Sequence, residues 1–523
     1  MSGIMHDQQK SNKVAEVLRH KAVHESKIGK FHEALINFNK SLCHAEPNTS
    51  TIAVIYANRA AVYYQLNLYD KSLNNILLAR ECHNNTDILN DLDDLEEKCY
   101  ENITDQIKYD DPWDYFKLSY PANKRIPFII DCLEVKNDKK FGRYVTTTRA
   151  LNAGDILAIE EPFFKILKVD PDDNEYPETN PYNYCANCLL DNYLDLIPCD
   201  DCLTTMFCSR KCMEEGNRMF HQYECNILDV LKETNNFRMA VRNFFVSLSI
   251  CNKNIEELKL LMEESDEKNP TIFNFDLSLR ENNSKDLLMA MMSLTHQTNV
   301  RVKDMTDVFQ HHKLLKKLWS KEKEFINKFL ERMMQVEILN FHGIKGQSLN
   351  AKSMFRRCVG DGSYAFCSLL NHSCCPNVMR IVVDNRMVLI CERPIKAGEQ
   401  LFDCYIGDSF YYKSKDHRQE ELEDYNFTCD CQACANDYAD ILSGLLPVIN
   451  HQTFRIAYTS YKDLQDPRKV LTIEQARKLA KKYSLILNQS YSDDSYPCKE
   501  LVMLQLCIVK CFLTAAFSPI VFT

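Results

Sequence analysis

Four close pairs of metal-binding side chains lie between residues 185 and 225. They are Cys185/Cys188, Cys199/Cys202, Cys208/Cys212 and His221/Cys225. Each pair can place two donor atoms on one tetrahedral ion at about 2.0 to 2.3 Å. Pairs at such spacings rarely recur four times by chance, which argues against a set of unrelated residues. The order predicts two closed, structural zinc sites, in which the first pair joins the third and the second joins the fourth.

A further cysteine group stands near residue 430. Cys429, Cys431 and Cys434 supply three quarters of a tetrahedral zinc site, so a fourth thiolate must come from elsewhere in the chain. Cys374 is the expected fourth ligand.

Several weaker signals surround these cysteines. Taken singly, an Asn-His dipeptide, a tyrosine or an isolated phenylalanine indicates a packed core as readily as a binding site. Their order along the chain is the informative part: Ser368, Asn371-His372-Ser373-Cys374, Gly398-Glu399, Tyr405, Tyr425 and Phe427.

Composition limits the class of protein. The chain has 523 residues, a formal charge of −10 and only 12 glycines. Its length allows three or four domains and its hydrophobic content excludes a disordered chain. The negative charge disfavours nucleic acid and anionic membranes, and the glycines complete no phosphate-binding loop. The polar first 30 residues contain no secretory signal, so the 24 cysteines are expected to be thiols or metal thiolates.

Helices are expected at the N-terminus. Apolar residues recur at helical spacing over residues 12–101, in two weakly similar units that match a tetratricopeptide hairpin. An unrelated helical bundle remains the alternative. The third helical segment, at residues 87–101, is acidic, which disfavours capture of a peptide's C-terminal carboxylate.

Strands are expected in two separate regions. Alternating patterns predict strands at 126–132, 144–148 and 156–159, and a hairpin of 377–383 with 386–392 across Asp384-Asn385. Helices are expected over 226–345 and from residue 435 onward. These strands predict one β domain split by insertions.

The apolar stretch from residue 501 to 523 allows two interpretations. A membrane anchor would place Lys510 near the bilayer centre, which costs about 2.5 to 3.5 kcal/mol. A buried helix of a terminal helical domain is therefore preferred, and no membrane association is expected.

Taken together, the motifs resemble the SET and MYND domain protein lysine methyltransferases, in the branch with N-terminal tetratricopeptide repeats. The resemblance implies an α+β multi-domain protein: a SET-type β fold split by a MYND zinc finger and a helical insert, flanked by N- and C-terminal helical (TPR-like) regions. The implied parts are TPR-like repeats (12–101), the SET N-terminal part (125–183), the MYND finger (184–226), the helical insert (227–350), the SET core (351–428), a post-SET zinc segment (429–434) and a C-terminal helical region (435–523).

The resemblance also implies residue roles. S-adenosylmethionine would be held by Gly142, Arg143, Ser368, Asn371, His372, Tyr405 and Phe427. Tyr405 would be the catalytic residue, and Asn340 and Tyr425 would line the lysine channel. Three zinc ions are implied, two in the MYND finger and one in the post-SET segment.

One departure and one alternative accompany the resemblance. The usual Gly-x-Gly of the cofactor loop is here Gly142-Arg143-Tyr144, which puts cofactor affinity in question. The alternative is an inactive adaptor that recruits proteins such as transcriptional corepressors through its MYND and TPR-like regions. DNA binding is a distant third, because residues 184–225 hold three basic and seven acidic side chains. A monomer located in both cytoplasm and nucleus is expected.

Overall fold

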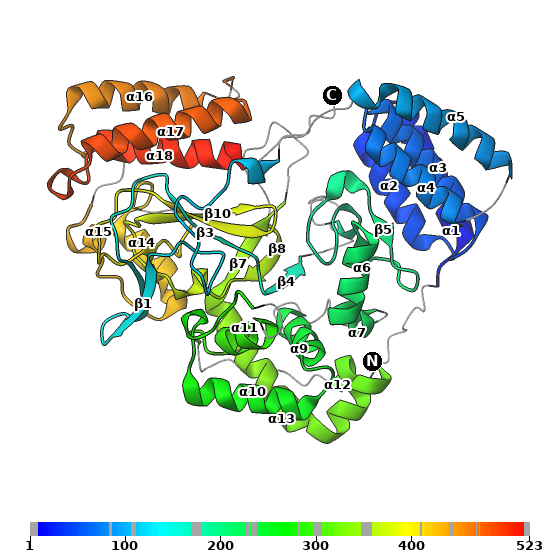
Figure 1. Ribbon diagram of the computed structural model, residues 1–523, viewed down its shortest axis with the longest axis horizontal. Helices are drawn as coiled ribbons and strands as arrows, with labels where there is room; N and C mark the ends of the chain where they lie inside the picture. Colours follow the sequence, from blue (N-terminus) through cyan, green and yellow to red (C-terminus); the bar gives the residue numbers. More distant parts are fainter. Residues whose placement is uncertain are drawn as a thin grey trace.

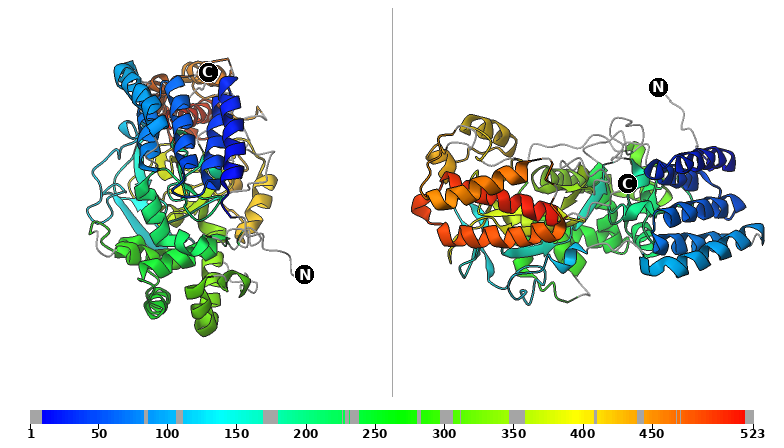
Figure 2. Two further views of the ribbon diagram at one scale, coloured as in Figure 1. Left: turned by 90° about the vertical axis from the view of Figure 1, so that its right-hand side faces the viewer. Right: turned by 90° about the horizontal axis from the view of Figure 1, so that it is seen from above.

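The computed structural model describes residues 9–516 apart from 83–85, 106–110, 169–179, 226, 228–230, 232–237, 280–282, 297–305, 311, 347–357, 408–409, 439–443, 467 and 470. Two helical regions lie at opposite ends of the molecule, with the sheets and the cysteine-rich module between them (Figures 1 and 2).

The N-terminal region consists of two antiparallel helical hairpins and one further helix. Helix α1 packs against α2 and α3 packs against α4. The helices are α1 (Asn12–Lys27), α2 (Phe31–His44), α3 (Ser50–Gln65), α4 (Tyr69–Cys82) and α5 (Thr86–Asn102). The predicted helices are confirmed, whereas their tetratricopeptide character stays a prediction.

The described residues that follow form five small sheets. Strand β11 pairs with both β10 and β3, β8 lies between β4 and β7, and three further pairs are β1–β2, β5–β6 and the parallel β9–β12. The strands are β1 (Leu133–Asp138), β2 (Gly142–Thr147), β3 (Ile156–Glu160), β4 (Phe164–Leu167), β5 (Ile197–Pro198), β6 (Met206–Phe207), β7 (Phe341–Lys345), β8 (Cys358–Ser363), β9 (Asn371–His372), β10 (Val378–Val383), β11 (Arg386–Cys391) and β12 (Phe402–Asp403).

The predicted hairpin is confirmed, and one predicted strand is wrong. Strands β10 and β11 pair across Asp384, whose φ of 54° fits a tight turn. Residues 126–132 instead form turns with isolated bridges, at Ile129 and Ile130, and the strand begins at Leu133. Pro127 cannot donate to a strand ladder, and the apolar residues there are buried in turns rather than alternating between faces.

Helices fill most of the insert between the two halves of the β region and most of the end of the chain. The predicted helical stretch is wrong for residues 341–345, which form β7 because they pair with β8. The insert packs below the sheets in Figure 1 and the C-terminal helices cover them from above. The helices are α6 (Arg210–Gly216), α7 (Gln222–Glu224), α9 (Arg238–Ile250), α10 (Ile255–Lys268), α11 (Asn283–Met292), α12 (Thr306–Phe309), α13 (Lys313–Asn340), α14 (Lys415–Leu422), α15 (Gln432–Ala435), α16 (His451–Gln465), α17 (Ile473–Ser490) and α18 (Lys499–Ala515).

Helix α18 settles the two interpretations of the apolar C-terminal stretch as far as residue 516. Leu501, Val502, Leu504 and Ile508 are buried in one cluster with α16 and α17. Among the described residues, no helix has the length and apolar character needed to cross a membrane. The preferred buried helix is therefore confirmed for α18.

Candidate active site and metal centres

The four ligand pairs converge into two groups between β5, β6, α6 and α7. Cys185, Cys188, Cys208 and Cys212 form one group, and Cys199, Cys202, His221 and Cys225 form the other. The donor atoms of each group lie within 4.8 Å of one another. Tetrahedral zinc with bonds of about 2.3 Å holds sulfurs about 3.8 Å apart, so both groups fit the ion. The predicted combination of first with third pair and second with fourth is confirmed.

Local structure delivers these ligands. The Ser209 hydroxyl accepts a hydrogen bond from the Cys212 N–H at 3.2 Å and so caps the start of α6. A π-helical turn at Asn217–His221 carries His221 into the second group, where its ring contacts Phe207 at 5.7 Å. Four protein ligands at each position leave no open coordination site, which is the arrangement of structural zinc.

The third group joins two distant segments. Cys374 follows β9, and its sulfur lies 3.9 Å from that of Cys429 and 3.6 Å from that of Cys434. Cys431 completes the group. Cys374 was the predicted fourth ligand, and its place in the group is confirmed.

Two side chains that the sequence reasoning missed support this group. The Gln419 amide and the Arg418 guanidinium from α14 point N–H donors at the Cys434 sulfur, at 3.4 and 3.6 Å. Donors of this kind stabilise a thiolate ligand. Nothing in the spacing of Arg418 and Gln419 distinguishes them from ordinary helix surface residues.

Asn371 and His372 form strand β9, beside β12. The Asn371 amide donates to the backbone carbonyls of Phe141 and Arg143, both at 3.2 Å. His372 accepts the Tyr405 N–H at its Nδ1 atom, 3.0 Å away. Burial lowers the pKa of His372 to about 4, so the ring is a neutral acceptor. The two residues thereby join β2, β9 and the segment after β12.

Tyr405 lies at the centre of an aromatic cluster. Its hydroxyl donates to the Leu370 carbonyl at 2.6 Å, and its ring centroid is 5.1 Å from that of Tyr425 and 5.3 Å from that of His372. The ring centroid of Phe427 lies 5.9 Å from that of His372, and Phe427 is 39% exposed. Burial raises the pKa of the Tyr405 hydroxyl above its ordinary value, which keeps it protonated.

The segment Gly142-Arg143-Tyr144 opens β2. Gly142 has a φ of 63°, and a β-carbon there would meet no atom within 4 Å. The Arg143 guanidinium donates to the Asn269 side chain at 3.3 Å, and the Arg143 carbonyl accepts a hydrogen bond from the Asn371 amide. The Tyr144 ring packs against Phe141 at 6.1 Å. Tyr144, which stands where the family has its second glycine, therefore leaves the space beside Gly142 open.

Asn340 and Ser368 contact each other beside this cluster. The Ser368 hydroxyl donates to the Asn340 carbonyl at 3.3 Å, and the Asn340 amide donates to the Thr295 carbonyl at 2.7 Å. These bonds join the end of α13 to the turn before β9. Both predicted site residues therefore hold together backbone segments that are distant in the chain.

A buried acid fixes the turn that carries Ser368. Glu160, at the end of β3, accepts the N–H groups of Phe366 and Cys367 at 2.8 and 3.0 Å. Burial raises the pKa of Glu160 to about 7, although the two N–H donors oppose that shift. The sequence gives no signal for this role, because Glu160 reads as the polar end of a strand.

A buried ion pair lies directly before Tyr405. The Arg380 Nε atom on β10 is 2.5 Å from the Asp403 carboxylate, with side chains only 16% and 5% exposed. Arg380 also donates to the Cys404 carbonyl at 3.2 Å and faces the His342 ring at 2.7 Å. It therefore orients the backbone that presents Tyr405. A lone arginine in the otherwise apolar strand VMRIVV is the one sequence signal that could have indicated it.

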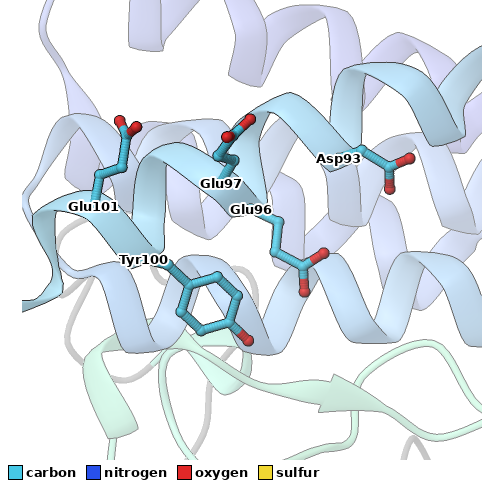
Figure 3. A pocket seen from close by; sticks show the side chains of 5 residues that line it. All are labelled: Asp93, Glu96, Glu97, Tyr100 and Glu101. Carbon is cyan, nitrogen blue, oxygen red and sulfur yellow. The ribbon is translucent and has the colours of Figure 1, made fainter.

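A shallow hollow on helix α5 lies apart from the residues described above. Asp93, Glu96, Glu97, Tyr100 and Glu101 line it, all from that helix (Figure 3). Four of its five lining side chains are carboxylates.

Comparison with known proteins agrees with this site. The SET domain model matches residues 142–406. The protein-lysine N-methyltransferase SMYD4 of Danio rerio is 22% identical over 82% of this chain and 66% of its own length. The histone-lysine N-methyltransferase SMYD3 of Mus musculus is 25% identical over 64% of this chain and 68% of its own, and the N-lysine methyltransferase SMYD2 of Homo sapiens is 24% identical over 57% and 59%. The chain thus spans just under two thirds of the length of the SMYD4 relative.

The matched SET region contains Asn371, His372 and Tyr405 and encloses the cysteine-rich module, whereas Tyr425 and Phe427 follow it in the chain. This chain belongs to the SET domain family, and within it to the SET and MYND domain proteins.

Proposed function

We propose that this protein is an S-adenosylmethionine-dependent protein-lysine N-methyltransferase, which transfers a methyl group to a lysine of a histone or non-histone protein by direct in-line displacement. The main support is the Tyr405 hydroxyl, which donates to the Leu370 carbonyl within a cluster formed with His372, Tyr425 and the partly exposed Phe427. The names of the relatives support the same reaction.

The residues around β2 and β9 fit the cofactor. The space beside Gly142 admits a close approach to the backbone, and Asn371 ties that backbone to β9. The partly exposed Phe427 ring offers an apolar face suited to an adenine base. We therefore assign Gly142, Arg143, Ser368, Asn371, His372, Tyr405 and Phe427 to cofactor binding.

When bound, S-adenosylmethionine supplies a methyl group on a positively charged sulfur. The part of this chain is to position and desolvate the acceptor amine. Tyr405 stays protonated and presents a fixed hydroxyl dipole, while Tyr425 and Asn340 would wall the lysine channel. A low dielectric lowers the pKa of a lysine amine and favours its neutral, nucleophilic form.

We further propose that the three cysteine-rich groups each bind one zinc ion. Soft thiolates with an imidazole are the donor set that zinc prefers, and no group offers an open position for catalysis. The ions would then stabilise the fold around the site and take no part in methyl transfer.

The adaptor interpretation is less well supported, because the residues of a complete site gather around Tyr405. Binding of partner proteins through the MYND and TPR-like regions is compatible with an active enzyme and is part of the proposal, as are a monomeric state and location in cytoplasm and nucleus.

The deciding experiment is calorimetric titration of S-adenosylmethionine into protein shown by metal analysis to hold about three zinc ions. Labelled S-adenosylmethionine is then incubated with histones and other lysine-rich proteins. We expect saturable binding and labelled lysine. Absence of cofactor binding to zinc-replete protein would reject the enzyme in favour of the adaptor.

A further inference from the structure

The inner face of helices α2, α3 and α4 contacts the cysteine-rich module. Polar side chains on this face converge on residues 192–196, which connect the first ligand pair to the second. The Asn39 amide donates to the Leu194 carbonyl at 3.0 Å, and the Arg59 guanidinium donates to the Leu196 carbonyl at 2.9 Å. Both donors are completely buried. The helices therefore hold the backbone of this segment through buried side-chain donors.

A carboxylate lies at the centre of the same contact. Asp195, only 3% exposed, is 3.3 Å from the Arg59 guanidinium. The amides of Asn75 and Asn74 on α4 donate to its two oxygens at 2.8 and 2.9 Å. A buried charge pair is tolerated only where such further hydrogen bonds satisfy both groups. The pocket is therefore matched to one acidic side chain.

The backbone of the bound segment is strained. Asn192, Tyr193 and Leu194 have φ values of 44°, 56° and 65°, three consecutive non-glycine residues in the left-handed region. Such a run persists only where the surroundings impose it. The Tyr63 hydroxyl donates to the Tyr193 carbonyl at 3.0 Å, and the Lys71 ammonium donates to the Asn192 side chain at 3.0 Å. The helices thus supply the contacts that hold this conformation.

We infer that α2, α3 and α4 form a binding site for a short acidic peptide segment, and that its resident ligand is this chain's own segment 192–196. The site recognises carbonyl oxygens and one aspartate flanked by two leucines. Because a tethered segment has a high effective concentration, it closes this face to external peptides. The inference does not depend on methyltransferase activity.

Hydrogen exchange on the full zinc-loaded chain tests the contact. Arg59→Met removes the central donor, and Asp195→Asn removes the charge while keeping the shape of the side chain if the first variant does not fold. Arg210→Met is the matched control, because Arg210 pairs with Glu81 across the same two parts of the chain but is 67% exposed. We expect amides 193–196 to exchange more than about tenfold faster in either test variant, with little change in the control. Equal rates in wild type and test variants would overturn the inference.

A labelled peptide of residues 191–198, DNYLDLIP, tests the recognition itself. We expect saturable binding to the Asp195→Asn chain, whose own segment is loosened, and none to wild type. Saturable binding to wild type would show that the face is open, and no binding to a variant with an exchanging segment would show that the face does not recognise this peptide. Either result would refute the proposed site.

Discussion

Arg380 provides the sharpest test of how the backbone before Tyr405 is held. Arg380→Met removes the guanidinium but leaves the Asp403 carboxylate, 5% exposed, without its charged partner. Breaking a buried pair in this way costs about 3 to 5 kcal/mol, because the remaining charge stays desolvated. At about 1.4 kcal/mol per tenfold change, the equilibrium constant for local opening increases by a factor of between about one hundred and a few thousand.

The matched control is on the neighbouring strand. Arg386 on β11 pairs with Glu161 at 2.7 Å, but those side chains are 39% and 70% exposed. Such a surface pair contributes about 0 to 1 kcal/mol, so Arg386→Met should change opening less than about fivefold.

Hydrogen exchange of the β10 and β11 amides measures both variants in the full chain, where a single global unfolding energy is not well defined. Methyl transfer should fall in Arg380→Met, since the Cys404 carbonyl also loses its donor at 3.2 Å. Similar exchange in the two variants would refute the argument that burial makes Arg380 a positioning residue.

Three further predictions concern the same region. Tyr405→Phe should abolish most methyl transfer while thermal stability stays close to wild type, because only one hydroxyl is removed; retained activity would exclude a role for the hydroxyl. Cys431→Ser should lower both cofactor affinity and the zinc content measured by metal analysis, and full zinc content would contradict the third site. Burial raises the pKa of Glu160 in the folded protein from 4.5 to about 7, so the folded state holds this proton more tightly than the unfolded state. The contribution of Glu160 to the free energy of unfolding therefore falls as pH rises between these values. Denaturation from pH 5 to 7 should therefore show wild type losing stability relative to Glu160→Gln, and a constant difference would contradict that shift.

The sequence predicts the metal groups well because ligand spacing is a local property of the chain. Cys199 and Cys202 are neighbours in any conformation, and only the combination of pairs needed the fold. Cys374 is less easily predicted, since the other cysteines of its group lie 55 or more residues away. Three clustered cysteines nevertheless require a fourth ligand for a tetrahedral ion.

Buried charges and turns were less predictable. Glu160 and Asp403 are ordinary polar residues in the sequence, and their roles arise only when distant strands enclose them. Arg380 has one weak signal, its place in an otherwise apolar strand. The wrong strand at 126–132 has the same origin, because an apolar run indicates burial without specifying whether the backbone is extended or turning.

The third cysteine group also has a consequence in terms of chain statistics. An ion held by Cys374 and Cys429 would close a loop of 55 residues, since these two ligands are that far apart in the chain. By the relation used for covalent cross-links, closing a loop of this length removes conformational entropy worth about 4 kcal/mol from the unfolded ensemble. That loop contains β10, β11, β12 and Tyr405. A single ion would therefore favour the joining of strands that must otherwise find each other by diffusion, and the folding rate of this half of the SET region should depend on when the metal arrives.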